Sequence, residues 1–329
     1  MIATGVYFSL YVDHELNCWA TGEWKGLTNA ARKVEMVPDL PPIQSVSAYY
    51  QSVLVDLNGG AWTCDLESRL LPIPNIPLMK SSAVGHKNSL LLSERGEVFV
   101  KADSNSCSTP KRIENIPPIC GLASGFEVSL FLDEEGGVWG LGNSKNYCLG
   151  VSDNVTQPIR ISNIPPMKAV SCGWNHSLFL DLDGNVWGCG SNFYGALPID
   201  VNLLKTPQIL EYPNKIKSIS AFYHHSICVG DDGSVWECRK NNSHLGYPQK
   251  EYDRAPTLKK IPINNDITSV TSLYHSLFLD SSGGVWGCGK NDKNQLGFNS
   301  SSDYVATPQQ IPDLPPIGRT FHVKSARNI

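Results

Sequence analysis

Apolar and polar residues alternate along the chain in short runs that are typical of β-strands. One unit has the sequence HSLFLD at residues 176–181, a turn, and then VWGCG at residues 186–190. A nearly identical unit spans residues 275–289. Short apolar runs bounded by Gly and Asp predict strands joined by tight turns. Each unit is therefore predicted to be a β-hairpin.

The hairpin unit recurs through the whole chain. A serine is followed, ten positions later, by an aromatic residue in seven copies. The pairs are Ser9/Trp19, Ser52/Trp62, Ser89/Phe99, Ser129/Trp139, Ser177/Trp187, Ser226/Trp236 and Ser276/Trp286. Successive aromatics are 43, 37, 40, 48, 49 and 50 residues apart. A constant inner spacing with a variable outer spacing predicts a rigid repeat joined by loops of different length.

The turn of the hairpin has a glycine three residues before the aromatic in six copies. Glycine is common at such positions because it adopts positive φ without steric cost. The first copy has Leu16 there, so we expect its turn to differ.

Two further strands complete each repeat. Proline-rich segments such as 40–43 and 164–167 precede alternating runs such as 43–48 and 216–221, and proline marks the loop before a strand. A fourth strand is predicted around Thr-Pro-x-x-Ile sequences, at 206–210 and 307–311. Repeats of about 40–50 residues with four strands are typical of propeller blades. The predicted fold is all-β, a seven-bladed β-propeller that forms a single domain over residues 1–329.

The two ends of the chain indicate how the propeller closes. The first repeat begins almost at Ser9, so it lacks the proline-rich lead and the upstream strand. A spare copy of both occurs at residues 314–325. We predict that this C-terminal strand completes the first blade, which closes the ring without an open sheet edge.

Composition narrows the possible functions. The chain of 329 residues is 41% hydrophobic and 18% charged, so it can bury a core. Its net charge of −4 does not support strong binding to a nucleic-acid backbone. We find no signal peptide, no run approaching the ~20 apolar residues of a membrane helix, and no clear nuclear signal. We expect an intracellular protein, cytoplasmic or associated with a host cell or virion, that does not contact a membrane.

Residues that often carry chemistry recur here at fixed repeat positions. Cys64, Cys189, Cys238 and Cys288 lie two residues after the aromatic, His176, His225 and His275 lie just before the serine, and five aspartates lie four residues after it. Equivalent positions in different blades are too far apart for a disulfide, and the chain has no C-x-x-C pair for zinc. We therefore assign these residues to structure, and we expect no catalytic residue, no cofactor and no metal site.

The motifs resemble the repeat family named after the regulator of chromosome condensation. The resemblance rests on the His-Ser start, the Asp-x-x-Gly turn, the Val-Trp-Gly-x-Gly strand and the Asn-x-x-x-Gln-Leu-Gly loop, which is clearest at residues 291–297. It covers the whole chain and is strongest in the C-terminal half. The short repeats also resemble compact, divergent members found in amoeba-infecting giant viruses and intracellular bacteria. Membership implies a seven-bladed propeller.

The best-known activity of that family is nucleotide exchange on the small GTPase Ran, through a wedge-like hairpin inserted into one blade. No repeat exceeds 50 residues here, so we find no insertion for a wedge. The family's chromatin docking also relies on a basic N-terminal tail, which this chain lacks. A Ran-like guanine nucleotide exchange factor is therefore an alternative, and a small GTPase is an unlikely partner.

The leading interpretation is a non-enzymatic scaffold for protein–protein interaction. The long loops after Trp139, Trp187, Trp236 and Trp286 are the predicted contact surface. Aromatic residues that we expect to be exposed add candidate contacts: Trp24, Phe193, Tyr194, Tyr247 and Tyr252. The alternative is a self-assembling structural subunit, of a virion or a filament, that associates with nucleic acid. A local basic patch would then comprise Lys111, Arg112, Lys215, Lys217, Lys259 and Lys260.

Overall fold

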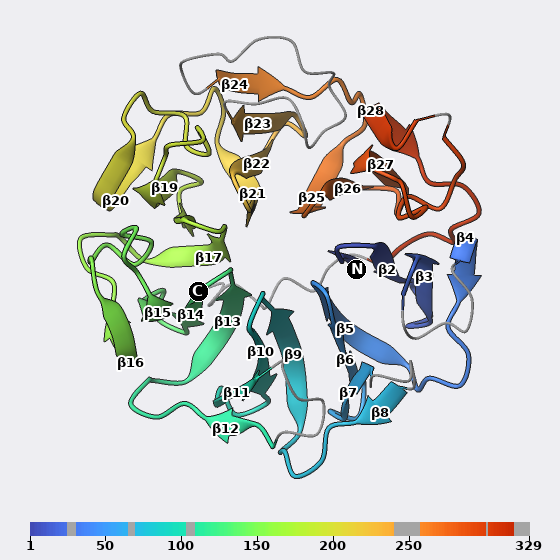
Figure 1. Ribbon diagram of the computed structural model, residues 1–329, viewed down its shortest axis with the longest axis horizontal. Helices are drawn as coiled ribbons and strands as arrows, with labels where there is room; N and C mark the ends of the chain where they lie inside the picture. The colour runs from blue at the N-terminus through green and yellow to red at the C-terminus, as the bar shows by residue number, and fades with distance from the viewer. Residues whose placement is uncertain (25–30, 65–69, 103–108, 240–256, 301, 319–329) are drawn as a thin grey trace. The chain divides into compact units, whose positions relative to one another are not determined.

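The computed structural model describes residues 1–24, 31–64, 70–102, 109–239, 257–300 and 302–318. Every regular element in these residues is a β-strand, and the 28 strands form seven sheets of four antiparallel strands. The sheets are the seven blades of a β-propeller, numbered here in chain order (Figure 1). The predicted fold class is confirmed. Because the chain divides into two compact units, each unit is described by itself, and the single domain over 1–329 stays a prediction.

Unit 1 comprises Met1–Arg112 and Thr271–Phe321 and holds blades 1, 2, 3 and most of blade 7. Its strands are β1 (Ile2–Thr4), β2 (Phe8–Val12), β3 (Cys18–Gly22), β4 (Ala31–Met36), β5 (Ile43–Ala48), β6 (Ser52–Asp56), β7 (Ala61–Cys64), β8 (Leu70–Pro72), β9 (Met79–Val84), β10 (Asn88–Ser93), β11 (Val98–Ala102), β12 (Lys111–Arg112), β25 (Ile267–Ser272, which crosses the boundary), β26 (His275–Asp280), β27 (Val285–Lys290) and β28 (Tyr304–Gln310).

Unit 2 comprises Ile113–Asn242 and Gln249–Val270 and holds blades 4, 5 and 6. Its strands are β13 (Ile119–Ser124), β14 (Val128–Asp133), β15 (Val138–Asn143), β16 (Asn154–Arg160), β17 (Met167–Cys172), β18 (His176–Asp181), β19 (Val186–Ser191), β20 (Leu203–Leu210), β21 (Ile216–Phe222), β22 (His225–Gly230), β23 (Val235–Arg239) and β24 (Thr257–Lys260).

The second strand of each blade is the most deeply buried. Every residue of β14, β18, β22 and β26 is buried. Within unit 2, β18 of blade 5 packs against blade 4 through Phe179 and against blade 6 through Leu178 and Leu180. The apolar cores therefore lie between neighbouring blades: one contains Leu132 of blade 4 and Phe179 of blade 5, and another contains Leu180 of blade 5 and Cys228 of blade 6. A strand that is buried on both faces has consecutive apolar residues, as β18 has at Leu178, Phe179 and Leu180.

The loops of a blade fall into two groups. Since the four strands alternate in direction, the loops between strands one and two (the 1–2 loops) and between strands three and four (the 3–4 loops) lie at one end of the blade. The hairpin turns between strands two and three lie at the other end, with the linkers to the next blade. The serine–aromatic spacing thus fixes the buried hairpin, and the 3–4 loops carry most of the variation in repeat length.

The first strand of blade 1 is shared between the two ends of the chain. In blade 2, Ile43 pairs with Asp56, and pairing resumes at Ser45 after a bulge. In blade 1, Ile317 pairs in the same way with Asp13, and pairing resumes with Ile2 opposite Tyr11. The C-terminal segment thus supplies the first position of this strand, and β1 supplies the rest.

The backbone around Ile317 repeats that of the other blades. The Ile317 N–H donates to Gly283 O at 2.9 Å, as Met79 N–H does to Gly59 O and Met167 N–H does to Gly136 O, both at 2.8 Å. The prediction that the C-terminal segment completes blade 1 is confirmed at this residue. The expectation that blade 1 lacks an upstream strand of its own is wrong, because Ile2–Thr4 forms β1. Residues 319–325 lie outside the described residues.

The turn at Leu16 is the same as the glycine turns. Leu16 has a φ of 68°, and Gly59 and Gly136 in the equivalent turns have φ of 82° and 83°. Its N–H donates to Asp13 O at 3.2 Å, as Gly59 N–H does to Asp56 O at 3.0 Å. The expectation of a different turn is therefore wrong, and a leucine tolerates left-handed backbone here at a cost of roughly 1–2 kcal/mol.

Substitution of Ile317 by Ala tests the shared strand. Ile317 is 1% exposed, so its truncation should lower the free energy of unfolding by about 2–4 kcal/mol, measured by urea denaturation. The matched control is Ile209→Ala, at a site 51% exposed, where the loss should stay within about 0.5 kcal/mol. Equal stability of I317A and the wild type would contradict the pairing of Ile317 with blade 1.

Candidate protein-interaction surface

The recurring aspartates hold the hairpin turns and the tryptophans. Asp181 Oδ1 accepts the Asn185 N–H at 2.8 Å, and Asp181 Oδ2 accepts the Trp187 indole N–H at 3.0 Å. The same indole bond joins Asp13 to Trp19, Asp56 to Trp62, Asp133 to Trp139 and Asp280 to Trp286, at 2.8–3.0 Å. These carboxylates are therefore engaged in structure.

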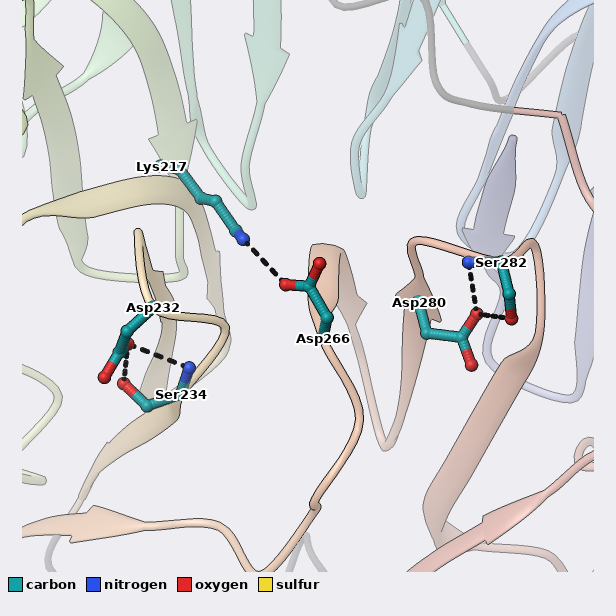
Figure 2. Close-up of polar contacts among 6 residues, drawn as sticks. All are labelled: Lys217, Asp232, Ser234, Asp266, Asp280 and Ser282. Carbon is teal, nitrogen blue, oxygen red and sulfur yellow. Dashed lines mark hydrogen bonds and ion pairs between the residues drawn. The ribbon is translucent and has the colours of Figure 1, made fainter.

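Blades 3 and 6 lack the aspartate, and each of them also lacks the indole–carboxylate bond. Blade 3 has Phe99, which has no indole N–H, and it has Ser93 in place of the aspartate. Blade 6 has Gly230 at the aspartate position, and its Trp236 donates instead to Ser234 Oγ at 2.9 Å. Ser234 in turn donates to Asp232, as Ser282 does to Asp280, both at 2.6 Å (Figure 2).

The same hydrogen bonds set the acidity of the turn carboxyls. Burial alone would raise the pKa of Asp181, but the hydrogen bonds from Trp187 and Asn185 outweigh it and hold that pKa below its ordinary value. An aspartate that stays ionised in this way is a poor proton donor near neutral pH.

The recurring histidines join neighbouring blades. His176 Nε2 lies 3.0 Å from Ser226 Oγ, and His275 Nε2 lies 2.7 Å from Ser9 Oγ. In both cases the serine belongs to the next blade, blade 1 following blade 7. Burial lowers the pKa of both histidines to about 3, so their rings stay neutral. For His176 and His275, the predicted structural role is confirmed by these hydrogen bonds.

The recurring cysteines make a parallel connection. The Cys189 S–H donates to Cys148 O and the Cys238 S–H donates to Gly195 O, each at 3.2 Å. Both acceptor carbonyls belong to the 3–4 loop of the preceding blade. Thr21, at the same repeat position, donates to Gln295 O at 2.6 Å. Burial raises the pKa of both thiols well above the ordinary value. These cysteines are therefore unreactive packing residues.

The six predicted basic residues are divided between the two units, and the patch as a whole stays a prediction. Lys217 lies on β21 and Lys259 and Lys260 lie on β24, which are opposite edges of one sheet, about 14 Å apart at three strand spacings. Lys217 pairs with Asp266 at 3.4 Å (Figure 2), and Lys215 donates to Asn185 at 2.6 Å. In unit 1, Arg112, next to Lys111 on β12, pairs with Glu97 at 3.0 Å.

The five predicted contact aromatics have different environments. Trp24 is 3% exposed and donates its indole N–H to Ser52 Oγ at 2.9 Å, so the expectation that it is exposed is wrong. Phe193 and Tyr194 are 63% and 45% exposed. Tyr247 and Tyr252 lie outside the described residues.

Phe193 and Tyr194 belong to a larger aromatic group in unit 2, which we call the aromatic stack. His224 lies between Tyr194 and Trp174, with ring centroids 3.7 and 5.0 Å away and interplanar angles of 26° and 16°. Trp174 also contacts Phe126 at 4.6 Å and Tyr223 at 4.4 Å. The stack comprises Phe126, Trp174, Phe193, Tyr194, Tyr223 and His224, from the 1–2 loops of blades 4, 5 and 6 and the 3–4 loop of blade 5.

The backbone fixes this stack. The Trp174 N–H donates to Tyr223 O in the next blade at 3.1 Å. Tyr223 has a φ of 42°, a conformation that bulky residues rarely adopt and that persists where surrounding contacts hold it. Phe126, Trp174, Tyr223 and His224 are half-buried, so the exposed pair Phe193 and Tyr194 rests on an ordered aromatic base.

Our sequence reasoning missed Phe126, Trp174, Tyr223 and His224. The signal for Phe126, Trp174 and Tyr223 lies three residues before each repeat serine, where the chain has Val6, Tyr49, His86, Phe126, Trp174, Tyr223 and Leu273. All seven side chains are bulky, and a position that is bulky in every repeat could have indicated contacts between blades. Val201 in the 3–4 loop of blade 5 (44%) and Leu203 at the start of β20 (39%) add exposed apolar surface.

Among the described residues, no group of three or more His, Cys, Asp or Glu side chains is placed to hold a metal ion. The described part of the chain also contains no helix long and apolar enough to cross a membrane.

Comparison with known proteins gives both a repeat family and a fold. Models of the regulator of chromosome condensation (RCC1) repeat match residues 135–180, 167–196 and 282–324. No curated protein sequence matches the chain.

Three solved structures have a similar fold. The structure of yeast RCC1 (Prp20) bound to Kap60 has a TM-score of 0.78 at 22% identity, over 92% of this chain and 85% of that one. A structure of Prp20p from Saccharomyces cerevisiae has a TM-score of 0.76 at 21% identity, over 92% and 87%. Human WBSCR16 has a TM-score of 0.72 at 17% identity, over 85% and 84%. At these identities the likeness concerns the fold alone.

The buried histidines predict a pH-dependent stability. Their pKa in the folded protein, about 3, lies below the ordinary value of about 6.5. Between these pH values the unfolded chain therefore binds more protons than the folded protein. The contribution of the two histidines to the free energy of unfolding is full above pH 6.5 and falls as the pH is lowered. Between pH 6 and 4, the free energy of unfolding of the His275→Gln variant should fall less steeply than that of the wild type. The two slopes should differ by up to about 1.4 kcal/mol per pH unit. Urea denaturation across this range measures the slope.

The control for this experiment is His14→Gln, because His14 is exposed and its substitution should leave the slope of the wild type. Parallel pH profiles for H275Q and the wild type would show that His275 is not held neutral by burial.

Proposed function

The chain is a member of the RCC1 repeat family, and we propose that it is a non-catalytic protein-interaction scaffold that binds its partner through the aromatic stack of unit 2. The observation that carries the proposal is the exposure of Phe193 and Tyr194 on an ordered aromatic base. Exposed aromatics backed by rigid packing are favoured as binding hot spots, because little side-chain entropy is lost on binding.

The position of the stack supports the proposal. The recurring Asp, Trp, His and Cys side chains are occupied in turns and in contacts between blades. The 3–4 loops differ most in length among repeats, and loops on a rigid frame commonly carry recognition. Among the described residues of these loops in unit 2, the largest exposed apolar side chains are Phe193 and Tyr194, in the 3–4 loop of blade 5.

The structurally similar proteins support the same class of function. Yeast RCC1 (Prp20) was solved in complex with Kap60, and Prp20p was described together with its binding to Gsp1p and histones. These partners belong to those proteins. Their relevance is that this fold serves as a frame for binding other proteins.

Substitution of both exposed aromatics tests the proposal. We expect the double variant F193S/Y194S to retain about a tenth or less of the binding to the partner, because hot-spot side chains contribute about 1–2 kcal/mol or more each. The measurement is quantitative capture from an extract of the native cell, with wild type and variant immobilised at equal density.

The matched control removes two equally exposed apolar residues from the hairpin turns, L57S/L182S (57% and 58% exposed). It should capture the partner as the wild type does. Equal capture by F193S/Y194S and the wild type, or equal loss in both double variants, would contradict the proposed surface. Light scattering of the purified protein in the same series measures self-association.

Nucleotide exchange on a small GTPase remains the alternative, since Prp20p has a similar fold. Within the described residues, every strand belongs to one of the seven four-stranded sheets, so these residues contain no extra hairpin of the wedge type. We expect no acceleration of fluorescent-nucleotide release from Ran-like GTPases at micromolar concentrations of this protein. Acceleration comparable to that by a family exchange factor, run as the positive control, would overturn this expectation.

A further inference from the structure

The 3–4 loop of blade 5 (residues 192–202) is a compact unit with its own hydrogen bonds. The Asn192 N–H donates to Asn202 O at 2.8 Å and closes the loop. The Asn192 side-chain amide donates to Leu197 O at 3.0 Å and to Ile199 O at 2.7 Å, and its oxygen accepts the Leu197 N–H at 2.8 Å. Asn192 is fully buried. The loop therefore presents its outer side chains in a fixed arrangement.

The outer side of this loop has two aromatic rings set at a right angle. The ring centroids of Phe193 and Tyr194 are 5.2 Å apart, and their planes meet at 84°. One face of Tyr194 rests on His224 at 3.7 Å, and the side chain is still 45% exposed. The two rings form an open corner whose walls are aromatic faces, and such faces attract cations.

A carboxylate belongs to the same loop. Asp200 is exposed, and it has no hydrogen bond or ion pair with any described residue. It precedes Val201, which is 44% exposed, and the bond between Asn192 and Asn202 brings this part of the loop back to the residue before Phe193. The loop thus combines a free negative charge, an aromatic corner and an exposed aliphatic side chain.

The charge of the loop at residues 192–202 favours a cationic partner, because Asp200 is its one charged side chain. Among the described residues, the 1–2 and 3–4 loops of unit 2 carry the carboxylates Glu127, Asp153 and Asp200 and the ammonium of Lys145. Lys205, just beyond the loop, lies with Nζ 5.7 Å from the ring centroid of Tyr147. This contact shows a cation on an aromatic ring in this part of the molecule. A phosphate-rich partner would instead meet carboxylates and the negative faces of the rings.

The geometry points to an arginine of a partner protein, flanked by apolar residues, as the occupant of the corner formed by Phe193 and Tyr194. This inference rests on the proposed function and names the chemistry of the partner. The guanidinium stacks on Tyr194 and pairs with Asp200, while the apolar neighbours cover Phe193 and Val201. Arginine fits better than lysine because its planar, weakly hydrated guanidinium both stacks on rings and forms forked bonds with a carboxylate.

The test uses three short peptides that differ in one side chain. Acetyl-Val-Xaa-Val-amide, with arginine, lysine or the neutral isostere citrulline at Xaa, is titrated into the full-length protein labelled for amide NMR. We expect the arginine peptide to shift the amides of residues 193–201 with millimolar affinity. The lysine peptide should bind about twofold or more weakly, and the citrulline peptide should give no saturable shift.

Variants of the protein test the contacts. Asp200→Asn should weaken the arginine peptide about two- to fivefold, the range expected for an exposed ion pair, and Tyr194→Leu should abolish the shifts. The matched control is Asp183→Asn, at an exposed aspartate of a hairpin turn, which should bind as the wild type does. Equal shifts with the citrulline peptide, or unchanged binding by D200N, would overturn the inference.

The variants distinguish a failure of this inference from a failure of the proposed function. If F193S/Y194S loses the native partner while D200N retains it, the surface stands and the arginine is wrong. If F193S/Y194S retains the partner, the surface itself is wrong.

Discussion

The hydrogen bonds between neighbouring blades limit which residues each repeat can have at its buried positions. Side chains of several repeats contact the adjacent blade, as His176 does with Ser226, Cys189 with the Cys148 carbonyl and Thr21 with the Gln295 carbonyl. These groups are buried, so losing one partner leaves a desolvated polar atom that costs about 1–3 kcal/mol. The same boundary joins the last blade to the first, where Ile317 continues the strand that Ile2–Thr4 begins.

Because of this constraint, the residues that stabilise the fold and the residues available for recognition lie in different parts of each repeat. Side chains that resemble catalytic or metal-binding residues are used at the blade boundaries or under the hairpin turns. In unit 2 the 1–2 and 3–4 loops lie at the end of each blade opposite the hairpin turns, and the 3–4 loops differ most in length from repeat to repeat. The aromatic stack combines both roles: Trp174 and Tyr223 connect two blades, and they support Phe193 and Tyr194, which face solvent.

The spacing of serine and aromatic was enough to predict the seven blades, because each hairpin is defined by local periodicity and a turn. Strand bounds also followed closely, as at Ile43–Ala48. Leu16 could not be predicted, since its left-handed backbone is imposed by the rest of the blade on a residue that disfavours it. Trp24 could not be distinguished from Phe193, because exposure in a loop depends on which neighbouring blade covers it. The stacking of His224 between Trp174 and Tyr194 depends on side chains from different blades, which only the folded chain brings together.

The most direct measurement is hydrogen–deuterium exchange on the complex with the native partner, compared with the free protein. The account predicts slower exchange in the loops of unit 2 that carry the stack, at residues 125–127, 173–175, 192–202 and 222–224, with the hairpin turns at 133–137, 181–185 and 230–234 unchanged. Protection confined to those hairpin turns, with no change at residues 192–202, would contradict the assignment of the aromatic stack as the binding surface.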